Sequence, residues 1–181
     1  VNRNVTSDPY AGVAPDEVID PRPFAEIVRQ FITLHPEFSW LPRKFKIAIT
    51  GAEEDRAATN VHDIGLKIIK NEAGDIGFRM LVGGGLGRSP FIAKVIRKFL
   101  PKDDLIRYLQ AILRVYNIEG RRDNLYKARI KILVHELGIE RFSSLVEEEF
   151  KSSEDDILFL GRSEEERIAA FFAAPDYADL P

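Results

Sequence analysis

A run of alternating side chains constrains the fold more than any other part of this sequence. Residues 44–50 read Lys-Phe-Lys-Ile-Ala-Ile-Thr, so large apolar side chains occupy every second position. Successive side chains of a β-strand point to opposite faces, so the apolar set can enter a core while Lys44 and Lys46 share the other face, about 7 Å apart at their Cα atoms. The pattern predicts a strand that aims two ammonium groups at one spot. From the residues alone, an edge strand whose lysines block aggregation explains it equally well.

The rest of the chain predicts an α+β fold. Apolar runs at 61–69 and 76–82, joined by a short turn that contains glycine, predict an antiparallel hairpin, although the first run could also be a short helix. Apolar residues at helical spacing predict helices at 21–35, 91–99, 102–116, 123–137 and 139–151. Residues 1–19 are expected to be extended or looped. We therefore expect a small mixed or antiparallel sheet with helices packed on one face.

The length of 181 residues suits one domain with a tail. We expect the domain to span residues 1–151, followed over 152–181 by a linker and a short amphipathic helix at 164–172. The net charge of -3 gives no support for a nucleic-acid binder. No apolar run approaches the roughly 20 residues of a membrane span, and no signal peptide is visible, so we expect no membrane partner and a cytoplasmic location.

A glycine-rich stretch is the second candidate for binding an anion. Residues 83–89 read Gly-Gly-Gly-Leu-Gly-Arg-Ser and should lead from a strand into the helix predicted at 91–99. Glycines let the backbone approach a ligand closely, and a helix N-terminus offers free N–H groups to an anion. The spacing matches neither common nucleotide-binding pattern, which makes a nucleotide a weak explanation. A strained turn with no ligand is a further alternative.

Neither the histidines nor the absence of cysteine supports a metal-binding site in this sequence. The pair His62-Asp63 lacks a third ligand, so a structural role is favoured, and His35 fits a helix end at which it touches the last carbonyls. The chain contains no cysteine, which excludes disulfides and thiolate metal sites. We predict no metal ligands within this sequence.

Four stretches, in this order, resemble the sirohaem-dependent sulfite and nitrite reductases. They are Asn2–Pro9, Leu41–Lys46, Leu81–Leu86 and Gly120–Lys131, and the resemblance covers most of residues 1–145. It implies that the anionic substrate is held by Arg3, Lys44 and Lys46. It also implies that sirohaem is contacted by Asn2, Arg43, Gly83, Gly84, Gly85, Arg88 and Arg122.

The resemblance further implies a six-electron reduction of sulfite to sulfide, with electrons from ferredoxin or a flavoprotein passing through a 4Fe-4S cluster. In the family four cysteines hold that cluster. Because this chain has none and starts on Val1 inside a family motif, we expect a piece of a longer enzyme: the sirohaem-facing domain of an assimilatory-type sulfite reductase, inactive alone and bound to the rest of its parent chain.

Three alternatives stay open. Nitrite enzymes of the family commonly carry asparagine where this chain has Lys46, so sulfite is favoured over nitrite without being settled. The chain could instead be a cofactor-free interaction module that uses its basic face. It could also be a phosphate- or nucleotide-binding domain centred on residues 83–89.

Overall fold

A computed structural model describes residues 2–33, 35–153 and 162–174 of the chain. Its five-stranded sheet has the order β1-β2-β3-β4-β5, formed by β1 (Asn2–Ser7), β2 (Phe45–Thr50), β3 (Ile64–Lys70), β4 (Ile76–Val82) and β5 (Lys94–Pro101). The helices are α1 (Arg22–Ile32), α2 (Leu105–Glu119), α3 (Ile130–Leu137), α4 (Ile139–Ser152) and α5 (Arg162–Phe171), with short 3-10 turns η1 (Phe38–Trp40), η2 (Thr59–Val61) and η3 (Lys102–Asp104).

The sheet is mixed. Strand β2 runs parallel to both β1 and β3, whereas β4 is antiparallel to β3 and to β5. The α+β class and the mixed sheet confirm the predicted fold. The explanation of Lys44 and Lys46 as guards of a sheet edge is wrong, because β2 lies inside the sheet, between two hydrogen-bonded neighbours.

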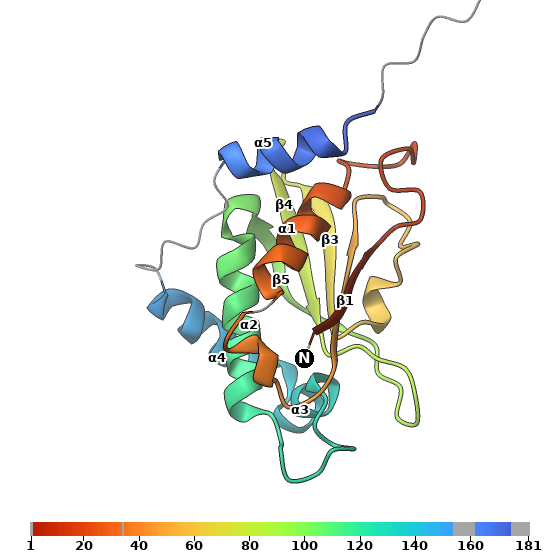
Figure 1. The fold of residues 1–181 in the computed structure, drawn as a ribbon. Coiled ribbons are helices and arrows are strands. Elements are labelled where there is room, and N and C mark those ends of the chain that lie inside the picture. The colour runs from red at the N-terminus through yellow and green to blue at the C-terminus, as the bar shows by residue number, and fades with distance from the viewer. Residues whose placement is uncertain (1, 34, 154–161, 175–181) are drawn as a thin grey trace, which may run out of the picture.

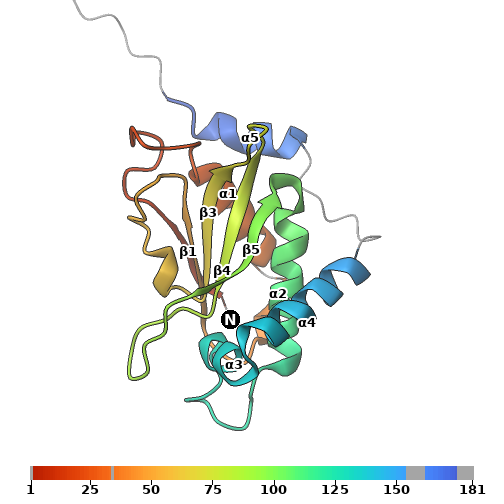
Figure 2. The ribbon, with the colours of Figure 1, turned by 180° about the vertical axis from the view of Figure 1, so that it is seen from behind.

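One face of the sheet carries the core (Figures 1 and 2). The side chains of Phe45, Ile47 and Ile49 are fully buried there, as the alternation predicts. Helix α2 packs on this face through Tyr116, whose ring centroid lies 5.8 Å from that of Phe45. Helix α1 packs on it through Phe24, 5.2 Å from the ring of Phe78 in β4. Helices α3 and α4 pack against α2 at one end of the sheet, as Figure 2 shows.

The helix predicted at 91–99 is wrong, and the helix predicted at 123–137 is wrong in part. Residues 94–101 form strand β5, because they pair with β4, for example Arg97 opposite Met80. A ladder of interstrand hydrogen bonds outweighs a weak helical periodicity. The helix predicted at 123–137 begins only at Ile130, and residues 121–129 are a loop. The linker predicted at 152–163 lies mostly outside the described residues.

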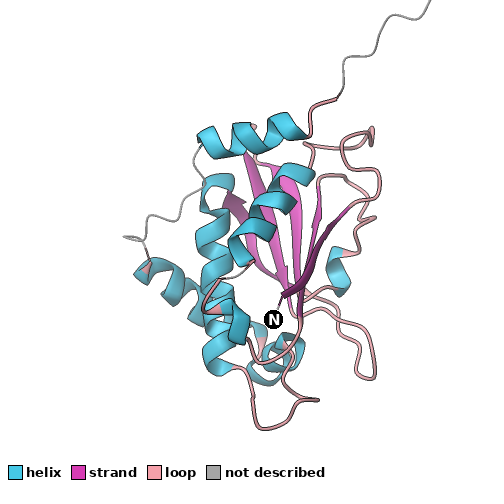
Figure 3. Cartoon of the chain, in the orientation of Figure 1, coloured by secondary structure: helices cyan, strands magenta, loops and turns pink. Residues whose placement is uncertain are grey.

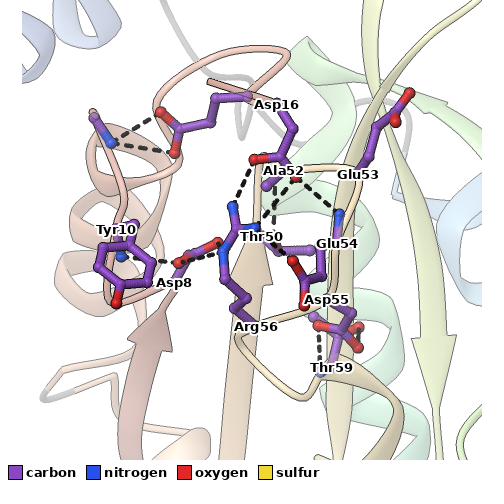
Figure 4. A network of polar contacts seen from close by, with 12 residues as sticks. Asp8, Tyr10, Asp16, Thr50, Ala52, Glu53, Glu54, Asp55, Arg56 and Thr59 are labelled. Carbon is purple, nitrogen blue, oxygen red and sulfur yellow. Dashed lines mark hydrogen bonds and ion pairs between the residues drawn. The ribbon is translucent and has the colours of Figure 1, made fainter. Parts of the chain in front are cut away.

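Loops gather at both ends of the strands (Figure 3). At the carboxyl ends of β1 and β2 they are fastened by Arg56, whose guanidinium reaches Asp8 at 3.0 Å, Asp16 at 2.7 Å and Glu54 at 3.0 Å (Figure 4). The Asp8 side chain is fully buried. One cation therefore joins the segment after β1 to the segment after β2, and closes the parallel pair at this end.

This cluster should give the fold a defined pH dependence. The hydrogen bond from Arg56 lowers the pKa of Asp16 from 3.8 to about 2. A lowered folded-state pKa stabilises the fold above the unfolded value, and this contribution is lost as the pH falls from about 4 to about 2. We expect Arg56→Met to lower the urea midpoint of unfolding at neutral pH. The difference in midpoint between variant and wild type should become smaller below about pH 4. Urea unfolding at several pH values measures this.

Arg88→Met is the matched control for this experiment. Arg88 is exposed and has no hydrogen-bond or ion-pair partner within the described part of the chain, so its removal should leave the midpoint unchanged. If the difference in midpoint between Arg56→Met and wild type is the same at neutral and at acid pH, the Arg56 cluster does not cause the pH dependence of stability.

Candidate functional site

The candidate site is a cavity of about 250 Å³ at the opposite end of β2 from Arg56. Its walls come from β2, from the turn before β3, from the loop between β4 and β5, and from the residue that precedes α3. The lining residues are Lys44, Lys46, Val61, His62, Asp63, Leu86 and Arg129. Segments far apart in the sequence thus meet at the amino end of one strand.

Lys44 and Lys46 bring two positive charges to this cavity. Lys44 is exposed and Lys46 is half-buried. Neither ammonium group has a hydrogen-bond or ion-pair partner among the residues that the structure describes. Two neighbouring cations without counter-ions attract an anion, because an anion between them relieves their repulsion.

The buried carboxylate of Asp63 fixes the walls of the cavity. Its side chain has 0% exposure, and Oδ2 accepts the backbone N–H of Lys46 at 3.0 Å while Oδ1 accepts Nη2 of Arg129 at 2.7 Å. The backbone oxygen of Asp63 accepts the N–H of Gly83 at 2.9 Å. Burial raises the pKa of the Asp63 carboxyl, and the charge and hydrogen bond of Arg129 oppose this rise. One residue therefore holds β2, the glycine loop and the start of α3 in place.

The basic residues at the start of α3 are less solvated than the composition of this segment suggests. Residue Lys131 is only 7% exposed, and its Nζ donates to the backbone oxygens of Leu86 at 3.0 Å and Ser89 at 2.6 Å. Burial lowers the pKa of Lys131. The side chain of Arg129 is 18% exposed, and its buried Nε has no hydrogen-bond partner within the described residues. Both side chains are therefore largely withdrawn from solvent.

The three consecutive glycines are needed for packing within the chain itself. A Cβ on Gly84 would lie 2.6 Å from the backbone oxygen of His62, and one on Gly85 would lie 2.9 Å from Cδ of Lys131. Gly83 adopts a φ of +84°, which favours glycine. The loop returns through a bridge between Gly85 and Phe91 into strand β5, so the anion-binding helix N-terminus predicted here does not exist.

Three further predicted site residues, Arg43, Arg88 and Arg122, are not among the residues that line the cavity. Arg43 is half-buried. Arg88 is exposed in the glycine loop. Arg122 is exposed but donates to the backbone oxygens of Trp40 and Asn117, each at 3.0 Å, so it fastens two loops.

Two predicted residues can be placed only by their backbone. Asn2 and Arg3 belong to β1, where Asn2 lies opposite Phe45 and Asn4 opposite Lys46. Their side chains lie outside what the structure describes. Sequence reasoning did not assign Arg129, Lys131 and His62 to the site. The available signals were the place of Arg129 and Lys131 within the family stretch Gly120–Lys131 and the polar pair His62-Asp63. Among the described residues, no group of three or more histidines or carboxylates could hold a metal ion, and none of the described helices has the length and apolar character to cross a membrane.

The fold and the cavity define an α+β domain with a pocket lined by Lys44, Lys46 and Arg129 at the amino end of a parallel strand. Residues 1–154 match the family model described as the nitrite and sulphite reductase 4Fe-4S domain, and the chain belongs to this family. Its relatives are oxidoreductases.

Relatives of both substrate types are similar to this chain. It is 34% identical over 149 residues to sulfite reductase (ferredoxin) 1 of Mycolicibacterium paratuberculosis, which covers 82% of this chain and 26% of the relative. It is 33% identical over 150 residues to the chloroplastic ferredoxin–nitrite reductase of Arabidopsis thaliana, covering 80% and 25%. The chain thus spans about a quarter of the length of these curated relatives.

The fold is also found in solved structures. The NirA protein of Mycobacterium tuberculosis superposes with a TM-score of 0.76 at 30% identity, covering 83% of this chain and 27% of that one. Dissimilatory sulfite reductase I superposes with a TM-score of 0.66 at 12% identity, over 81% and 52% of the two chains, and at that identity supports the fold alone.

The pair of Arg129 and Asp63 allows a direct test of what holds the cavity together. We expect Arg129→Met to lower the free energy of unfolding by about 3 kcal/mol, because it leaves a buried carboxylate without its counter-ion. The loss should grow from about pH 5 to about pH 8, because without Arg129 the folded state favours the protonated carboxyl. Adding Asp63→Asn should restore much of the loss. Urea unfolding measures all three chains.

Arg79→Met is the control, since Arg79 is exposed on β4 and has no partner within the described residues. The central role of the ion pair is refuted if the single and the double variant lose the same stability at both pH values.

Proposed function

We propose that this chain is the sirohaem- and sulfite-facing domain of an assimilatory sulfite reductase, with the domain proper over residues 1–151 and a connection to the rest of the reductase over 152–181. The observation that carries the proposal is the pair of ammonium groups, Lys44 and Lys46, which lack a partner within the described residues and line one cavity in a member of this reductase family.

The residues of the cavity fit a tetrapyrrole rich in carboxylates. The buried Nε of Arg129 has no hydrogen-bond partner in the described part of the chain. Arg88 is exposed and follows closely after Leu86, a residue that lines the cavity. Guanidinium groups pair well with carboxylates. In the proposal, Asn2, Arg43, Gly83, Gly84, Gly85, Arg88 and Arg122 contact sirohaem. The chemistry that this group would supply is coordination of the substrate by iron and delivery of electrons.

The chain's own contribution is charge and protons. Arg3, Lys44 and Lys46 would neutralise the anion in a site shielded from water, where each charge stabilises developing negative charge strongly. Lysine also suits proton delivery to departing oxygens, because its proton is released more readily among other cations. Asp63 would keep Lys46 and Arg129 in position throughout, by the two hydrogen bonds at 3.0 and 2.7 Å.

The residues do not fit the cluster for which the family is named. The chain contains no cysteine, and a 4Fe-4S cluster is held by cysteine thiolates. We therefore place the cluster on another part of the reductase, and expect this chain alone to produce no sulfide from sulfite. The electron donor would be ferredoxin, as the names of the relatives suggest, or a flavoprotein. A cytoplasmic location stays part of the proposal and rests on the sequence alone.

Lys44→Met in the full-length reductase tests the carrying observation. Methionine keeps the aliphatic stem and removes the charge, so the fold should persist while sulfite reduction falls about 100-fold. Lys70→Met is the matched control, because Lys70 is exposed at the far end of β3. The readouts are sulfide formation and the melting temperature. Equal activity of the Lys44→Met chain and wild type would remove the catalytic role from this strand.

A second observation, the identity of residue 46, favours sulfite over nitrite as the proposed substrate. Relatives of both kinds are about equally similar, so the choice rests on Lys46. Near neutral pH sulfite carries more charge than nitrite, and Coulomb attraction scales with the product of charges, so a second ammonium favours sulfite. We expect Lys46→Asn to lower kcat/KM for sulfite while sparing or raising it for nitrite. A wild type that prefers nitrite, or a proportional loss of both activities, would favour the nitrite reductase alternative or a purely structural Lys46.

A further inference from the structure

The imidazole of His62 lines the same cavity as Lys44 and Lys46 and has no role in the function proposed above. Its Nδ1 lies 2.8 Å from the backbone oxygen of Ala58. A carbonyl oxygen only accepts hydrogen bonds, so Nδ1 carries a hydrogen in either charge state. The ring nitrogen left for the cavity is Nε2, which accepts a hydrogen bond when the ring is neutral and donates one when it is protonated.

The backbone that holds this ring is strained. Ala58 has a φ of 55° and is the one residue other than glycine with a positive φ in the described part of the chain. Its carbonyl oxygen also accepts the N–H of Val61 at 3.0 Å, and the carboxylate of Asp55 fixes the turn by accepting the N–H of Thr59 at 2.9 Å. Strained residues persist where the surrounding structure over-determines them, and they cluster at functional sites. Here the strained backbone of Ala58 places its carbonyl oxygen beside Nδ1 of His62, and this contact fixes the tautomer of the ring.

Three cations face the cavity beside His62. Lys46 of β2, Lys44 just before β2 and Arg129 before α3 line the same space. The adjacent Asp63 has both oxygens engaged, by Arg129 and by the backbone of Lys46. The carboxylate of Asp55, in the turn before η2, is likewise taken up by the side chains of Thr59 and Asn60. A further positive charge beside two unpaired ammonium groups is unfavourable until an anion lies among them.

We propose that His62 is a third anion-facing acid of this cavity, whose Nε2–H, once protonated, donates to a bound oxyanion and couples anion binding to proton uptake. This rests on the proposed anion site at Lys44 and Lys46. During reduction, the proton on Nε2 passes to an oxygen of the anion, and the ring stays behind neutral with its Nδ1–H still bonded to Ala58.

Histidine NMR on the 181-residue chain tests the proposal, with sulfate as the probe because it stays a dianion over the pH range used. The sequence contains three histidines, and His35 and His135 are not among the residues that line the cavity. We expect the neutral His62 ring to be the Nδ1–H tautomer. We expect sulfate to move the midpoint of the His62 titration to higher pH while the other two midpoints stay in place. By reciprocity, sulfate should bind about tenfold more tightly at about pH 5.5 than at about pH 8.

Three variants separate the protonation of His62 from its place in the fold and from the anion site itself. His62→Asn retains an N–H donor toward Ala58 and places nothing at the position of Nε2, so it should keep the unfolding midpoint and lose the pH dependence of sulfate binding. His62→Gln places an amide near Nε2 and should keep most of the affinity at the higher pH without gaining any at the lower pH. Lys46→Met is expected to weaken sulfate binding at both pH values.

The outcomes are distinct. A His62→Asn chain that retains the full pH dependence, or an Nε2–H tautomer in wild type, would overturn the role of His62. Sulfate binding that is independent of pH but sensitive to Lys46→Met would also overturn it and leave the anion site standing. No sulfate binding in wild type at either pH would overturn the anion site, and His62 with it.

Discussion

The buried carboxylate of Asp63 is the interaction on which the cavity depends. It accepts one hydrogen bond from the backbone of Lys46 and another from the guanidinium of Arg129, and its own backbone oxygen holds Gly83. A fully buried charge is tolerated only when it is paired and hydrogen-bonded, so Asp63 draws three distant segments toward itself. The lysines of β2 then need no carboxylate of their own, and their charges stay available to a ligand.

The two ends of β2 show opposite electrostatic arrangements. At the carboxyl end, one guanidinium, that of Arg56, collects the carboxylates of Asp8, Asp16 and Glu54, and the charges neutralise one another. At the amino end, cations outnumber the single carboxylate, which Arg129 already pairs. The first arrangement stabilises the fold. The second leaves an excess of positive charge in a confined space, where an anion is attracted more strongly than at an open surface.

Membership of the nitrite and sulphite reductase family gives a chemical reason for this excess of positive charge. The family's substrates are small oxyanions, and a rigid strand is a better platform for two ammonium groups than a loop would be. The glycine loop contributes in a different way from the one its composition suggests. Its glycines permit close packing against His62 and Lys131, and Lys131 in turn holds the backbone of Leu86, a residue of the cavity wall. The loop thus shapes the wall whether or not a ligand touches its backbone.

The sequence alone determined those features that depend on neighbouring residues. The period of two over residues 44–50 decided which side chains of β2 enter the core and which face the site, and four short motifs in order indicated the family. Tertiary structure decided the rest. Strand β5 replaced a predicted helix because pairing with β4 outweighs local propensity. The burial of Arg129 and Lys131 and the place of His62 in the cavity follow from contacts such as that of Arg129 with Asp63, 66 residues away in the chain. No local pattern encodes a partner at that separation, because its position is set only when the sheet and α3 have packed together.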